Sequence, residues 1–369
     1  MAEFTVKLPG RDYCRRAVIE NGRLTELSRV ENAATDLWLT RGLVDIQVNG
    51  FRGVNLTGTG LTSADLAACE TALAAEGVVC WCPTITTQDP EVIRASLDAL
   101  ATAIESGALK RVHCLHLEAN FLSPEEGYRG AHLERYMREP DISEFESWQA
   151  AARGRIGYVS LAPELKGAIE FIGYLVSRGI LVALAHHNAS PEQVFRAAEA
   201  GARLSTHLFN GCAGSIPRHS NVILSQLAED RLWASFIPDG HHVPYHVLKM
   251  GLRVKGLELS LFTSDLVYLG GMPDGEYTKA ERTVEVRDGG VWIKGTSYLS
   301  GAWCSLARGI ERATAAGVVT PGEALRLASL NPARLLGLKD NLEPRAGCGG
   351  PFVLFREIGG ALKLDRIIE

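Results

Sequence analysis

Acidic and histidine residues follow several apolar segments of this sequence, each at the point where the segment ends. Glu118 comes directly after the segment 112–117, and His207 comes directly after the segment 202–206. Residues of the same kinds follow further apolar segments: His186, His187, Asp239, His241, His242 and Asp265. Carboxylate oxygens and imidazole nitrogens are ligands for Zn²⁺-like ions, and a catalytic site of this kind leaves one coordination position open for water. These residue types therefore indicate metal-assisted activation of water, provided that the fold brings them together.

The apolar segments themselves are typical of buried parallel strands, because helical patterns separate them along the chain. Seven segments have this character: 43–48, 112–117, 158–162, 180–185, 202–206, 233–237 and 258–263. Strands that alternate with helices in this number favour an α/β fold, a (β/α)₈ TIM-like barrel, over an open sheet. All strands of such a barrel end at one face, where active sites form, so the polar residues should converge there.

Three of the intervening helices carry clear signals at their first residues. Pro90 fits the first helical position after an aspartate, and Gln193 stands where a capping box requires it. The expected N-cap residues of the three helices are Thr62 or Ser63, Asp89 and Ser190. These helices lie between the predicted strands, as a barrel requires.

Both ends of the chain are short, strand-like and rich in turns. A hairpin turn is expected at 20–23, where Asn21 and Gly22 stand together. Neither end is long enough to form a hydrophobic core alone. We therefore predict that residues 1–41 and 335–369 fold together as a small β-sandwich domain, beside a barrel of residues 42–334.

The composition is that of an ordinary globular protein, with 46% hydrophobic and 22% charged residues. The formal net charge is −5, and no run of Lys or Arg could follow a phosphate backbone, so a nucleic-acid partner is not expected. No apolar stretch approaches the ~20 residues that span a bilayer, and membrane association is not expected either. The eight cysteines are scattered, and the first residues lack a signal-peptide pattern. A cytoplasmic location with reduced thiols is therefore expected.

The strand-end residues and their neighbours resemble the N-acetylglucosamine-6-phosphate deacetylase family, a branch of the amidohydrolase superfamily. The resemblance extends over nearly the whole chain, and its segments occur in the same order and at similar spacing. The matching segments are GLVDIQVNG (42–50), HLE (116–118), LAPE (161–164), HHNAS (186–190), THLFN (206–210), DGHH (239–242), GMPDGEY (271–277) and NPAR (331–334).

The resemblance implies a single metal ion and assigns its ligands and the general acid/base. Superfamily members often carry a His-x-His pair after the first barrel strand for a second metal, whereas this chain has Gln47 and Asn49 there. Asp265 is implied as the residue that takes a proton from water and delivers it to the departing amine. The divalent ion, Zn²⁺ as the first expectation and Fe²⁺ or another as alternatives, is assigned to Glu118, His186 and His207.

The resemblance also implies a set of substrate contacts at the mouth of the barrel. Arg218 lies where the family places an arginine for the sugar phosphate, and a planar guanidinium suits paired phosphate oxygens. His132 or His242 could bind the phosphate or stabilise a developing oxyanion, so both join Asp265 as catalytic candidates. The full set of implied contacts is Ala131, His132, Asn210, Gly211, Arg218, His242, Leu299, Ser300 and Gly301.

Three departures from the family pattern lie beside these functional positions. Ala119 and Asn120 replace Gly-Pro after the metal-binding glutamate, and 219–221 (His-Ser-Asn) replaces Glu-Pro-Gly after Arg218. Ser264 also separates the usual Thr-Asp pair before the acid/base. The metal chemistry is untouched by these changes, whereas the loops that select the sugar are altered.

The expected reaction is hydrolysis of the acetamide of N-acetylglucosamine 6-phosphate, which gives glucosamine 6-phosphate and acetate. One alternative is the same deacetylation of another N-acetylated sugar, such as N-acetylgalactosamine 6-phosphate or a substrate without phosphate. A second alternative is a sugar-phosphate-binding relative that lost catalysis. The resemblance further implies a homodimer.

Overall fold

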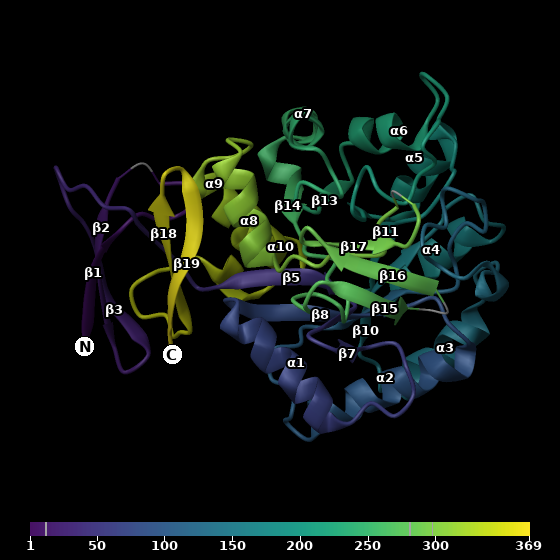
Figure 1. Ribbon diagram of the computed structural model, residues 1–369, viewed down its shortest axis with the longest axis horizontal. Helices are drawn as coiled ribbons and strands as arrows, with labels where there is room; N and C mark the ends of the chain where they lie inside the picture. Colours follow the sequence, from purple (N-terminus) through teal and green to yellow (C-terminus); the bar gives the residue numbers. More distant parts are fainter. Residues whose placement is uncertain (12, 280–281, 297) are drawn as a thin grey trace.

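The computed structural model describes residues 1–11, 13–279, 282–296 and 298–369. It shows a barrel of parallel strands surrounded by helices, with a smaller group of antiparallel strands at one side that contains both chain ends (Figure 1). Among the residues described, no helix combines the length and the apolar content needed to cross a bilayer.

Eight parallel strands form the barrel wall, hydrogen-bonded to one another in sequence order. They are β5 (Leu43–Val48), β8 (Val78–Thr86), β9 (Leu115–Glu118), β10 (Ile156–Leu161), β11 (Leu181–Leu184), β12 (Leu204–Ser205), β13 (Trp233–Phe236) and β14 (Ser260–Phe262). The wall closes just after β14, where the Asp265 amide donates to the Gln47 carbonyl at 3.1 Å. The Asn49 amide likewise donates to the Leu266 carbonyl at 2.7 Å. The predicted barrel is therefore confirmed.

Strand β8 is the one barrel strand that the apolar segments did not predict. It contains Pro83, and a proline normally argues against a central strand because it cannot donate to the hydrogen-bond ladder. The ladder with β5 shifts register on the way from Asp45 to Val48, which pairs with Pro83. This local irregularity lets the proline occupy the wall of the barrel.

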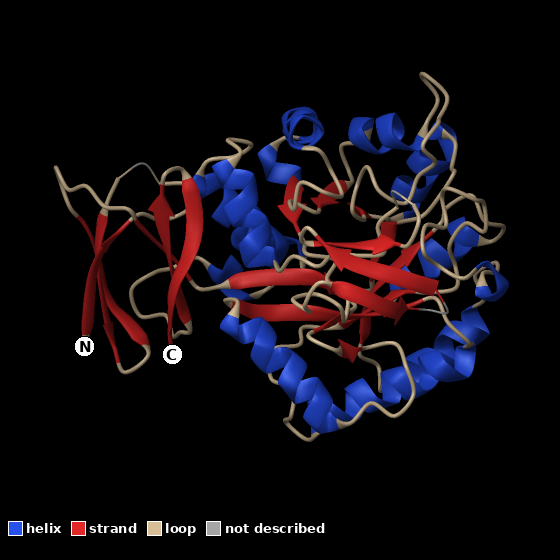
Figure 2. Ribbon diagram, in the orientation of Figure 1, coloured by secondary structure: helices blue, strands red, loops and turns tan. Residues whose placement is uncertain are grey.

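Helices form the outer ring of the barrel (Figure 2). The principal ones are α1 (Ser63–Ala75), α2 (Pro90–Glu105), α3 (Ile142–Ala151), α4 (Ala168–Ser177), α5 (Pro191–Ala200), α6 (Val222–Ala228), α7 (Tyr245–Lys255), α8 (Leu306–Ala315), α9 (Pro321–Leu325) and α10 (Asn331–Leu335). Short helical turns are η1 (Glu134–Tyr136), η2 (Leu257–Leu259), η3 (Arg326–Leu330) and η4 (Lys339–Leu342). The predicted N-caps are confirmed: Thr62 caps α1, Asp89 caps α2, and Ser190 with Gln193 forms a capping box on α5.

The two chain ends form two antiparallel sheets, which we call the terminal sheets. One contains β1 (Ala2–Val6), β2 (Arg15–Glu20) and β3 (Arg23–Arg29), and the other contains β4 (Leu37–Thr40), β18 (Phe352–Ile358) and β19 (Ala361–Ile368). Strand β18 pairs with both β4 and β19, so segments from opposite ends of the chain share one sheet. The predicted union of both ends in a small β-structure is confirmed, whereas the domain bounds 1–41, 42–334 and 335–369 stay a prediction. The side chains of Leu335, Leu336, Leu338 and Leu342 pack against the inner cluster of the barrel.

A third antiparallel sheet, which we call the hairpin sheet, is inserted between β14 and α8. It contains β15 (Gly275–Lys279), β16 (Arg282–Arg287) and β17 (Gly290–Ile293), and a small two-stranded ladder of β6 (Gly50–Phe51) and β7 (Val54–Asn55) follows β5. The hairpin sheet packs on a small core of its own: Val267, Leu269, Val284, Val286 and Val291. Figure 1 shows it in front of the barrel strands. The sequence analysis assigned no strands to this segment.

A buried glutamate joins helix α1 to the wall of the barrel. Glu70 is 7% exposed and accepts hydrogen bonds from Trp81 Nε1 at 3.0 Å and from the backbone amides of Lys110 and Arg111 at 2.8 and 2.9 Å. Replacing Glu70 by Ala would leave these three donors without their acceptor. We expect this substitution to lower the free energy of unfolding by about 3 kcal/mol, measured by urea denaturation.

A surface glutamate provides the control for this measurement. Glu170 lies on the exposed face of α4, so Glu170→Ala should change the free energy of unfolding by no more than about 0.5 kcal/mol. A loss below about 1 kcal/mol for Glu70→Ala would show that the three donors find water instead.

Candidate active site

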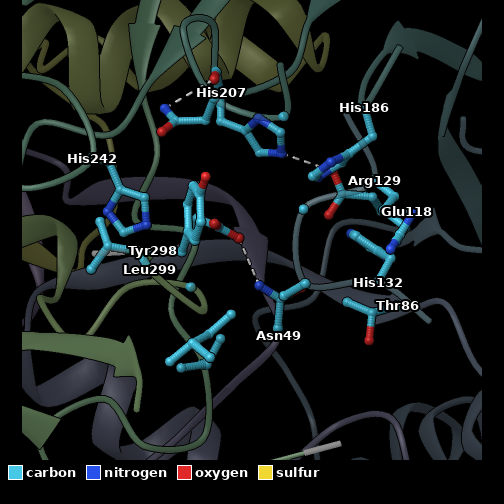
Figure 3. A pocket seen from close by; sticks show the side chains of 18 of the residues that line it. Asn49, Thr86, Glu118, Arg129, His132, His186, His207, His242, Tyr298 and Leu299 are labelled. Carbon is cyan, nitrogen blue, oxygen red and sulfur yellow. Dashed lines mark hydrogen bonds and ion pairs between the residues drawn. The ribbon is translucent and has the colours of Figure 1, made fainter. Parts of the chain in front are cut away.

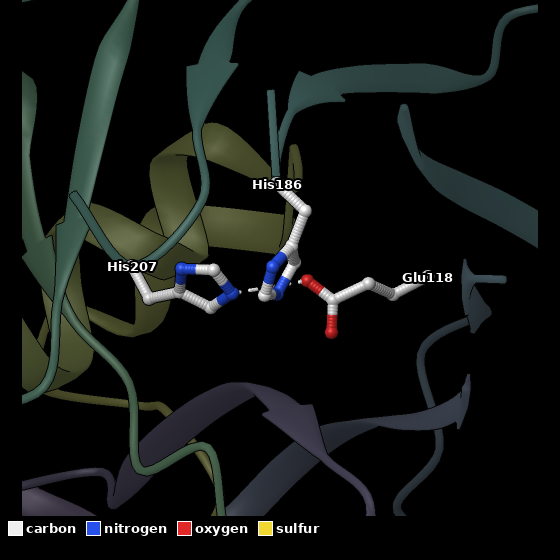
Figure 4. A group of neighbouring side chains, drawn as sticks. All are labelled: Glu118, His186 and His207. Atoms are coloured by element: carbon white, nitrogen blue, oxygen red, sulfur yellow. Dashed lines mark hydrogen bonds and ion pairs between the residues drawn. The ribbon is translucent and has the colours of Figure 1, made fainter. Parts of the chain in front are cut away.

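Three side chains from the ends of three barrel strands meet in one cluster, which we call the metal triad: Glu118, His186 and His207 (Figure 4). Glu118 ends β9, whereas His186 follows β11 and His207 follows β12. Each offers one possible ligand atom, and these atoms all lie within 4.8 Å of one another. The structure therefore brings together the three residues that the sequence analysis assigned to a metal ion.

The backbone is strained at the two histidines of the metal triad and at Asp265. His186, His207 and Asp265 have φ angles of 47°, 34° and 54°, in the left-handed region that residues with a Cβ rarely adopt. Such strain persists only where the surrounding structure imposes it, and it gathers at functional sites. In Figure 4 both imidazole rings point toward Glu118.

Hydrogen bonds and burial prepare the two histidines as neutral ligands. His186 Nδ1 lies 2.8 Å from the Tyr128 carbonyl, to which it donates, so Nε2 keeps its lone pair. Burial, together with the neighbouring His207, lowers the pKa of His186 to about 4. Burial also lowers the pKa of His207, whose Nε2 lies 3.1 Å from Glu118 Oε1. Both rings are therefore in the form that binds metals at neutral pH.

The carboxylate of the triad lacks a strong cation beside it. Burial raises the pKa of Glu118 to about 7, and among the described residues no Lys or Arg forms an ion pair with it. A buried carboxylate is costly without a compensating positive charge. A divalent cation would offset that cost, so the residues present fit a metal ion.

Two amide side chains, those of Gln47 and Asn49, lie beside the carboxylates of the site. Gln47 Nε2 donates to Glu118 Oε2 at 2.9 Å, and Asn49 Nδ2 donates to Asp265 Oδ1 at 2.7 Å. Figure 3 marks the second of these bonds with a dashed line from Asn49. The two amides therefore hold the carboxylates of the site through donated hydrogen bonds.

His242 and His132 lie in the same region but have opposite electrostatic surroundings. His242 Nδ1 lies 2.8 Å from Asp239 Oδ2; burial alone would lower the pKa of His242, but Asp239 outweighs it and raises the pKa. His132 Nδ1 lies 2.8 Å from the Thr87 hydroxyl, and burial beside the histidines of the triad lowers the pKa of His132 well below its ordinary value. His242 is thus disposed to carry a positive charge, and His132 to remain neutral.

The metal triad, Asp265, His132 and His242 line one cavity of about 740 Å³ at the mouth of the barrel (Figure 3). The residues singled out from the sequence that line it are Asn49, Glu118, Ala131, His132, His186, His207, Asn210, Gly211, His241, His242, Asp265, Leu299 and Gly301. Gly211, at φ +61°, is needed beside His186, because a Cβ there would lie 2.8 Å from His186 Nδ1. The metal triad and Asp265 therefore share a cavity large enough for a sugar phosphate.

Two of the implied substrate contacts do not line this cavity. Ser300 is buried and accepts hydrogen bonds from Lys279 Nζ, through its carbonyl at 2.7 Å and its hydroxyl at 3.0 Å. Arg218 is exposed in the segment that precedes α6. The interior of the cavity in this chain is therefore built without either side chain.

Several cavity residues were not singled out from the sequence. They include Arg129, Phe209, Lys279, Arg282 and Tyr298. The matching segment 271–277 ends at Tyr277, and Lys279 follows two residues later. This proximity to a family motif was the available signal for a role of Lys279 in the site. Because the hairpin sheet was not predicted, the sequence analysis could not place Lys279 near the metal triad.

Comparison with known proteins identifies the family, although no protein-family model matches the sequence. The N-acetylgalactosamine-6-phosphate deacetylase of Escherichia coli O157:H7 is 32% identical over 80% of this chain and 77% of its own length. The N-acetylglucosamine-6-phosphate deacetylase of Vibrio furnissii is 32% identical over 82% of this chain and 75% of its own length. The chain belongs to the N-acetylglucosamine-6-phosphate deacetylase family.

A solved structure of this deacetylase family supports the same assignment. A mutant N-acetyl-D-glucosamine-6-phosphate deacetylase from Mycobacterium smegmatis, in complex with N-acetyl-D-glucosamine 6-phosphate, matches with a TM-score of 0.85. It is 25% identical, and the match covers 99% of this chain and 98% of that one. The sequence-based predictions of the family and of a hydrolytic deacetylase are therefore confirmed.

The pair of Asp239 and His242 predicts a pH-dependent stability. Because the pKa of His242 is raised, its charged form stabilises the folded protein. This stabilisation is complete below about pH 6.5 and is lost as the pH rises through the pKa of His242 in the folded state. Burial alone would raise the pKa of Asp239, but His242 outweighs burial and lowers it. The stabilisation of the folded protein by ionised Asp239 is therefore lost as the pH falls below about 4. Asp239→Asn should therefore destabilise the protein more at about pH 5.5 than at about pH 8.5, as measured by urea denaturation.

The amide in Asp239→Asn still accepts the backbone hydrogen bonds from His241 and His242, so the substitution isolates the charge. His242→Gln serves as the control, because on that background Asp239→Asn should have the same effect at both pH values. An effect of Asp239→Asn that is independent of pH in the parent chain would contradict the ion pair.

Proposed function

We propose that this chain hydrolyses the acetamide of N-acetylglucosamine 6-phosphate to glucosamine 6-phosphate and acetate. The observation that carries the proposal is the convergence of Glu118, His186 and His207 on the cavity that also contains Asp265. The chain belongs to a family whose relatives are named for this reaction, and the Mycobacterium smegmatis structure holds this sugar phosphate.

We propose that the metal triad holds one divalent ion, with Zn²⁺ as the first candidate and Fe²⁺ as the alternative. Neutral imidazoles with a carboxylate are a donor set that accepts either ion. When bound, a divalent ion supplies positive charge that polarises a carbonyl and favours the ionisation of water. A single ion is proposed because Gln47 and Asn49 donate to the carboxylates of the site, whereas ligands must offer lone pairs.

Asp265 is proposed to move the proton between water and the leaving nitrogen. Its Oδ1 is held by Asn49, which leaves Oδ2 to accept a proton from water and return it to the amine. Burial raises the pKa of Asp265, although His207 opposes this, so the protonated form becomes easier to reach. An amine departs readily only after protonation, and the same carboxyl group would supply that proton.

His242 and His132 are proposed to bind polar groups of the substrate in different ways. Asp239 raises the pKa of His242 against the opposing effect of burial and so favours its charged form, which suits a phosphate or a developing oxyanion. His132 is neutral and hydrogen-bonded to Thr87, which suits a carbonyl or a sugar hydroxyl. The implied contacts Ala131, Asn210, Gly211, Leu299 and Gly301 line the same cavity and are proposed to surround the sugar.

The N-acetylgalactosamine 6-phosphate deacetylase reaction is the second candidate. It is favoured by the Escherichia coli O157:H7 relative, which is named for that substrate and is 32% identical. The two sugars differ only in the orientation of one hydroxyl group. The altered loops after Glu118 and Arg218 are the places where this chain could select between them.

A panel of four sugars tests the proposal, namely N-acetylglucosamine and N-acetylgalactosamine, each with and without the 6-phosphate. Acetate release by the Zn²⁺-loaded protein is measured for each sugar, and kcat/KM should be highest for N-acetylglucosamine 6-phosphate. A higher value for N-acetylgalactosamine 6-phosphate would establish the second candidate. The absence of acetate release from all four sugars would overturn the proposal.

The homodimer and the cytoplasmic location stay predictions, and light scattering would test the former.

A further inference from the structure

A second cavity lies where the terminal sheets meet the barrel, and we call it the junction cavity. Its volume is about 420 Å³, which is within the range of small-molecule sites, and it shares no lining residue with the catalytic cavity. Four cationic side chains line it: Arg23, Arg41, Lys339 and Arg345. Figure 1 shows the two chain ends on the same side of the barrel. The proposed function uses none of these four residues.

The walls of the junction cavity come from three separate parts of the chain. Arg23 begins β3, Arg41 joins β4 to β5, and the segment 339–349 runs from η4 toward β18. A backbone bond fixes this segment on β3, because the Gly347 amide donates to the Leu24 carbonyl at 2.7 Å. A ligand in the cavity would therefore contact segments that come together only when the chain folds.

Positive charge exceeds negative charge in this cavity. Asp340 is the one carboxylate among its described lining residues, and it pairs with Arg345. Arg23 donates to a backbone carbonyl at 2.6 Å, which leaves its charge unpaired. In the part of the chain that the structure describes, Arg41 and Lys339 form no ion pair or side-chain hydrogen bond. The cavity thus concentrates positive charge in a chain whose formal net charge is −5.

Arg41 contributes a buried donor that lacks an acceptor. The residue is half-buried, and its Nε is buried and bonds to no acceptor among the described residues. A guanidinium stays protonated in proteins, so Arg41 cannot lose its charge. Buried polar groups in native proteins are nearly always hydrogen-bonded, and a buried donor without an acceptor is costly. An anion in the junction cavity would offset the charge of this guanidinium.

The types of the cationic side chains favour a phosphate group over a carboxylate. Three of the four are arginines, and a guanidinium offers paired N–H donors that match two phosphate oxygens. A phosphate monoester carries about two negative charges and three acceptor oxygens at neutral pH. A carboxylate carries a single charge and a pair of oxygens. Cations that approach from three parts of the chain are therefore better matched by a phosphate group.

We propose that the junction cavity binds a phosphate-type anion, either free phosphate or the phosphate group of a small metabolite. Arg41 and Arg345 supply paired donors, and Lys339 supplies a compact positive charge beside them. The site is separate from the catalytic cavity and does not depend on the proposed function. Because its walls belong to different parts of the chain, the bound anion stabilises their association.

Modification of arginines by phenylglyoxal, mapped by mass spectrometry, tests this site residue by residue. Inorganic phosphate at roughly ten times Kd should lower the modification rates of Arg41 and Arg345 by about tenfold. Arg196 is the control, because it is exposed on α5 and lies outside the cavity lining, and its rate should not change. Sodium chloride at the same ionic strength should protect none of the three. Absence of phosphate protection at Arg41, or equal protection by chloride, would overturn the site.

Calorimetry with inorganic phosphate measures the contribution of each cation. Arg41→Met and Lys339→Met should each weaken phosphate binding at the junction cavity by about tenfold or more, as expected for a charge-assisted hydrogen bond. Arg41→Lys should retain part of the affinity, because it keeps the charge. Lys339 is exposed, so Lys339→Met keeps the test available if Arg41→Met fails to fold in thermal melting. Arg196→Met should bind phosphate as the parent does. Unchanged phosphate binding in both Arg41→Met and Lys339→Met would contradict the proposal.

Glucose 6-phosphate distinguishes the two sources of the phosphate group, because it has no acetamide to hydrolyse. Protection of Arg41 at lower concentrations of glucose 6-phosphate than of inorganic phosphate would identify a phosphorylated metabolite as the ligand. Protection at lower concentrations of inorganic phosphate would identify the free anion. If the parent releases acetate from none of the four sugars, the proposed function fails, while protection of Arg41 by phosphate still supports the junction cavity as an anion site.

Discussion

Replacing Asp265 by Asn is expected to lower kcat for acetate release by about 10³-fold while the metal content stays unchanged. Asparagine has nearly the same shape, and its side-chain oxygen can still accept the hydrogen bond from Asn49. The backbone amide of residue 265 continues to bond to the Gln47 carbonyl, so the closure of the barrel is preserved. What the amide cannot do is accept a proton from water and return it to the amine.

Acetate assays and elemental analysis of the same preparation measure this prediction. Asp98→Asn is the control, since Asp98 is an exposed residue of α2 that pairs with Arg153 far along the chain. Its kcat and metal content should equal those of the parent. If Asp265→Asn keeps more than about a tenth of the parent kcat, another group moves the proton. If it loses its metal, Asp265 belongs to the ligand set.

Removal of the metal, or of its carboxylate ligand, is expected to have the next largest effect. Chelation should abolish acetate release, and added Zn²⁺ should restore it. Glu118→Gln should lose both metal and activity, because an amide is a poor ligand even though Gln47 stays beside it. Because the metal binds the folded state and not the unfolded state, it should raise the free energy of unfolding of the parent by about 4 kcal/mol at a metal concentration 1,000-fold above Kd.

The pH dependence of metal binding follows from the buried carboxyl group. Burial raises the pKa of Glu118 to about 7, whereas that of His186 is lowered to about 4. Glu118 must be ionised to bind a cation, so metal affinity should fall as the pH decreases below about 7. Calorimetric titration of the metal-free protein with Zn²⁺ at several pH values would measure this.

A surface variant provides the control for the metal measurements. Glu170→Gln, on the exposed face of α4, should match the parent in metal content and in the increase of melting temperature on adding Zn²⁺. Glu118→Gln should show no such increase. An unchanged metal content in Glu118→Gln would exclude Glu118 as a ligand.

The sequence was sufficient to predict the barrel and the meeting of the metal triad, because parallel strands end at a common face. Once Glu118 and His207 are placed at the ends of buried strands, their meeting follows from the fold. Strand β8 was missed because Pro83 lies within it. The hairpin sheet was missed because strands such as β15 are short and largely exposed, so they lack the buried apolar run of the barrel strands.

The sequence did not allow us to predict which way the side chains of loop residues face. Arg218 and Ser300 occupy positions that match the family, yet neither side chain lines the cavity in this chain. Whether a loop residue faces a cavity depends on backbone angles and on neighbours such as Lys279, which bonds to Ser300. Those neighbours come from a sheet that the sequence analysis did not foresee.

The closure of the barrel also has a consequence for synthesis of the protein. Gln47 lies in the first barrel strand and Asn49 directly follows it, whereas Asp265 and Leu266 lie just beyond the last strand. In a chain emerging from the ribosome, all three residues of the metal triad are synthesised before residue 265. If Asp265 moves the proton as proposed, acetate release requires that the residues after the final barrel strand have joined those of the first. Acetate release is therefore a reporter of completed chain closure, suited to screening permuted or split forms of the protein.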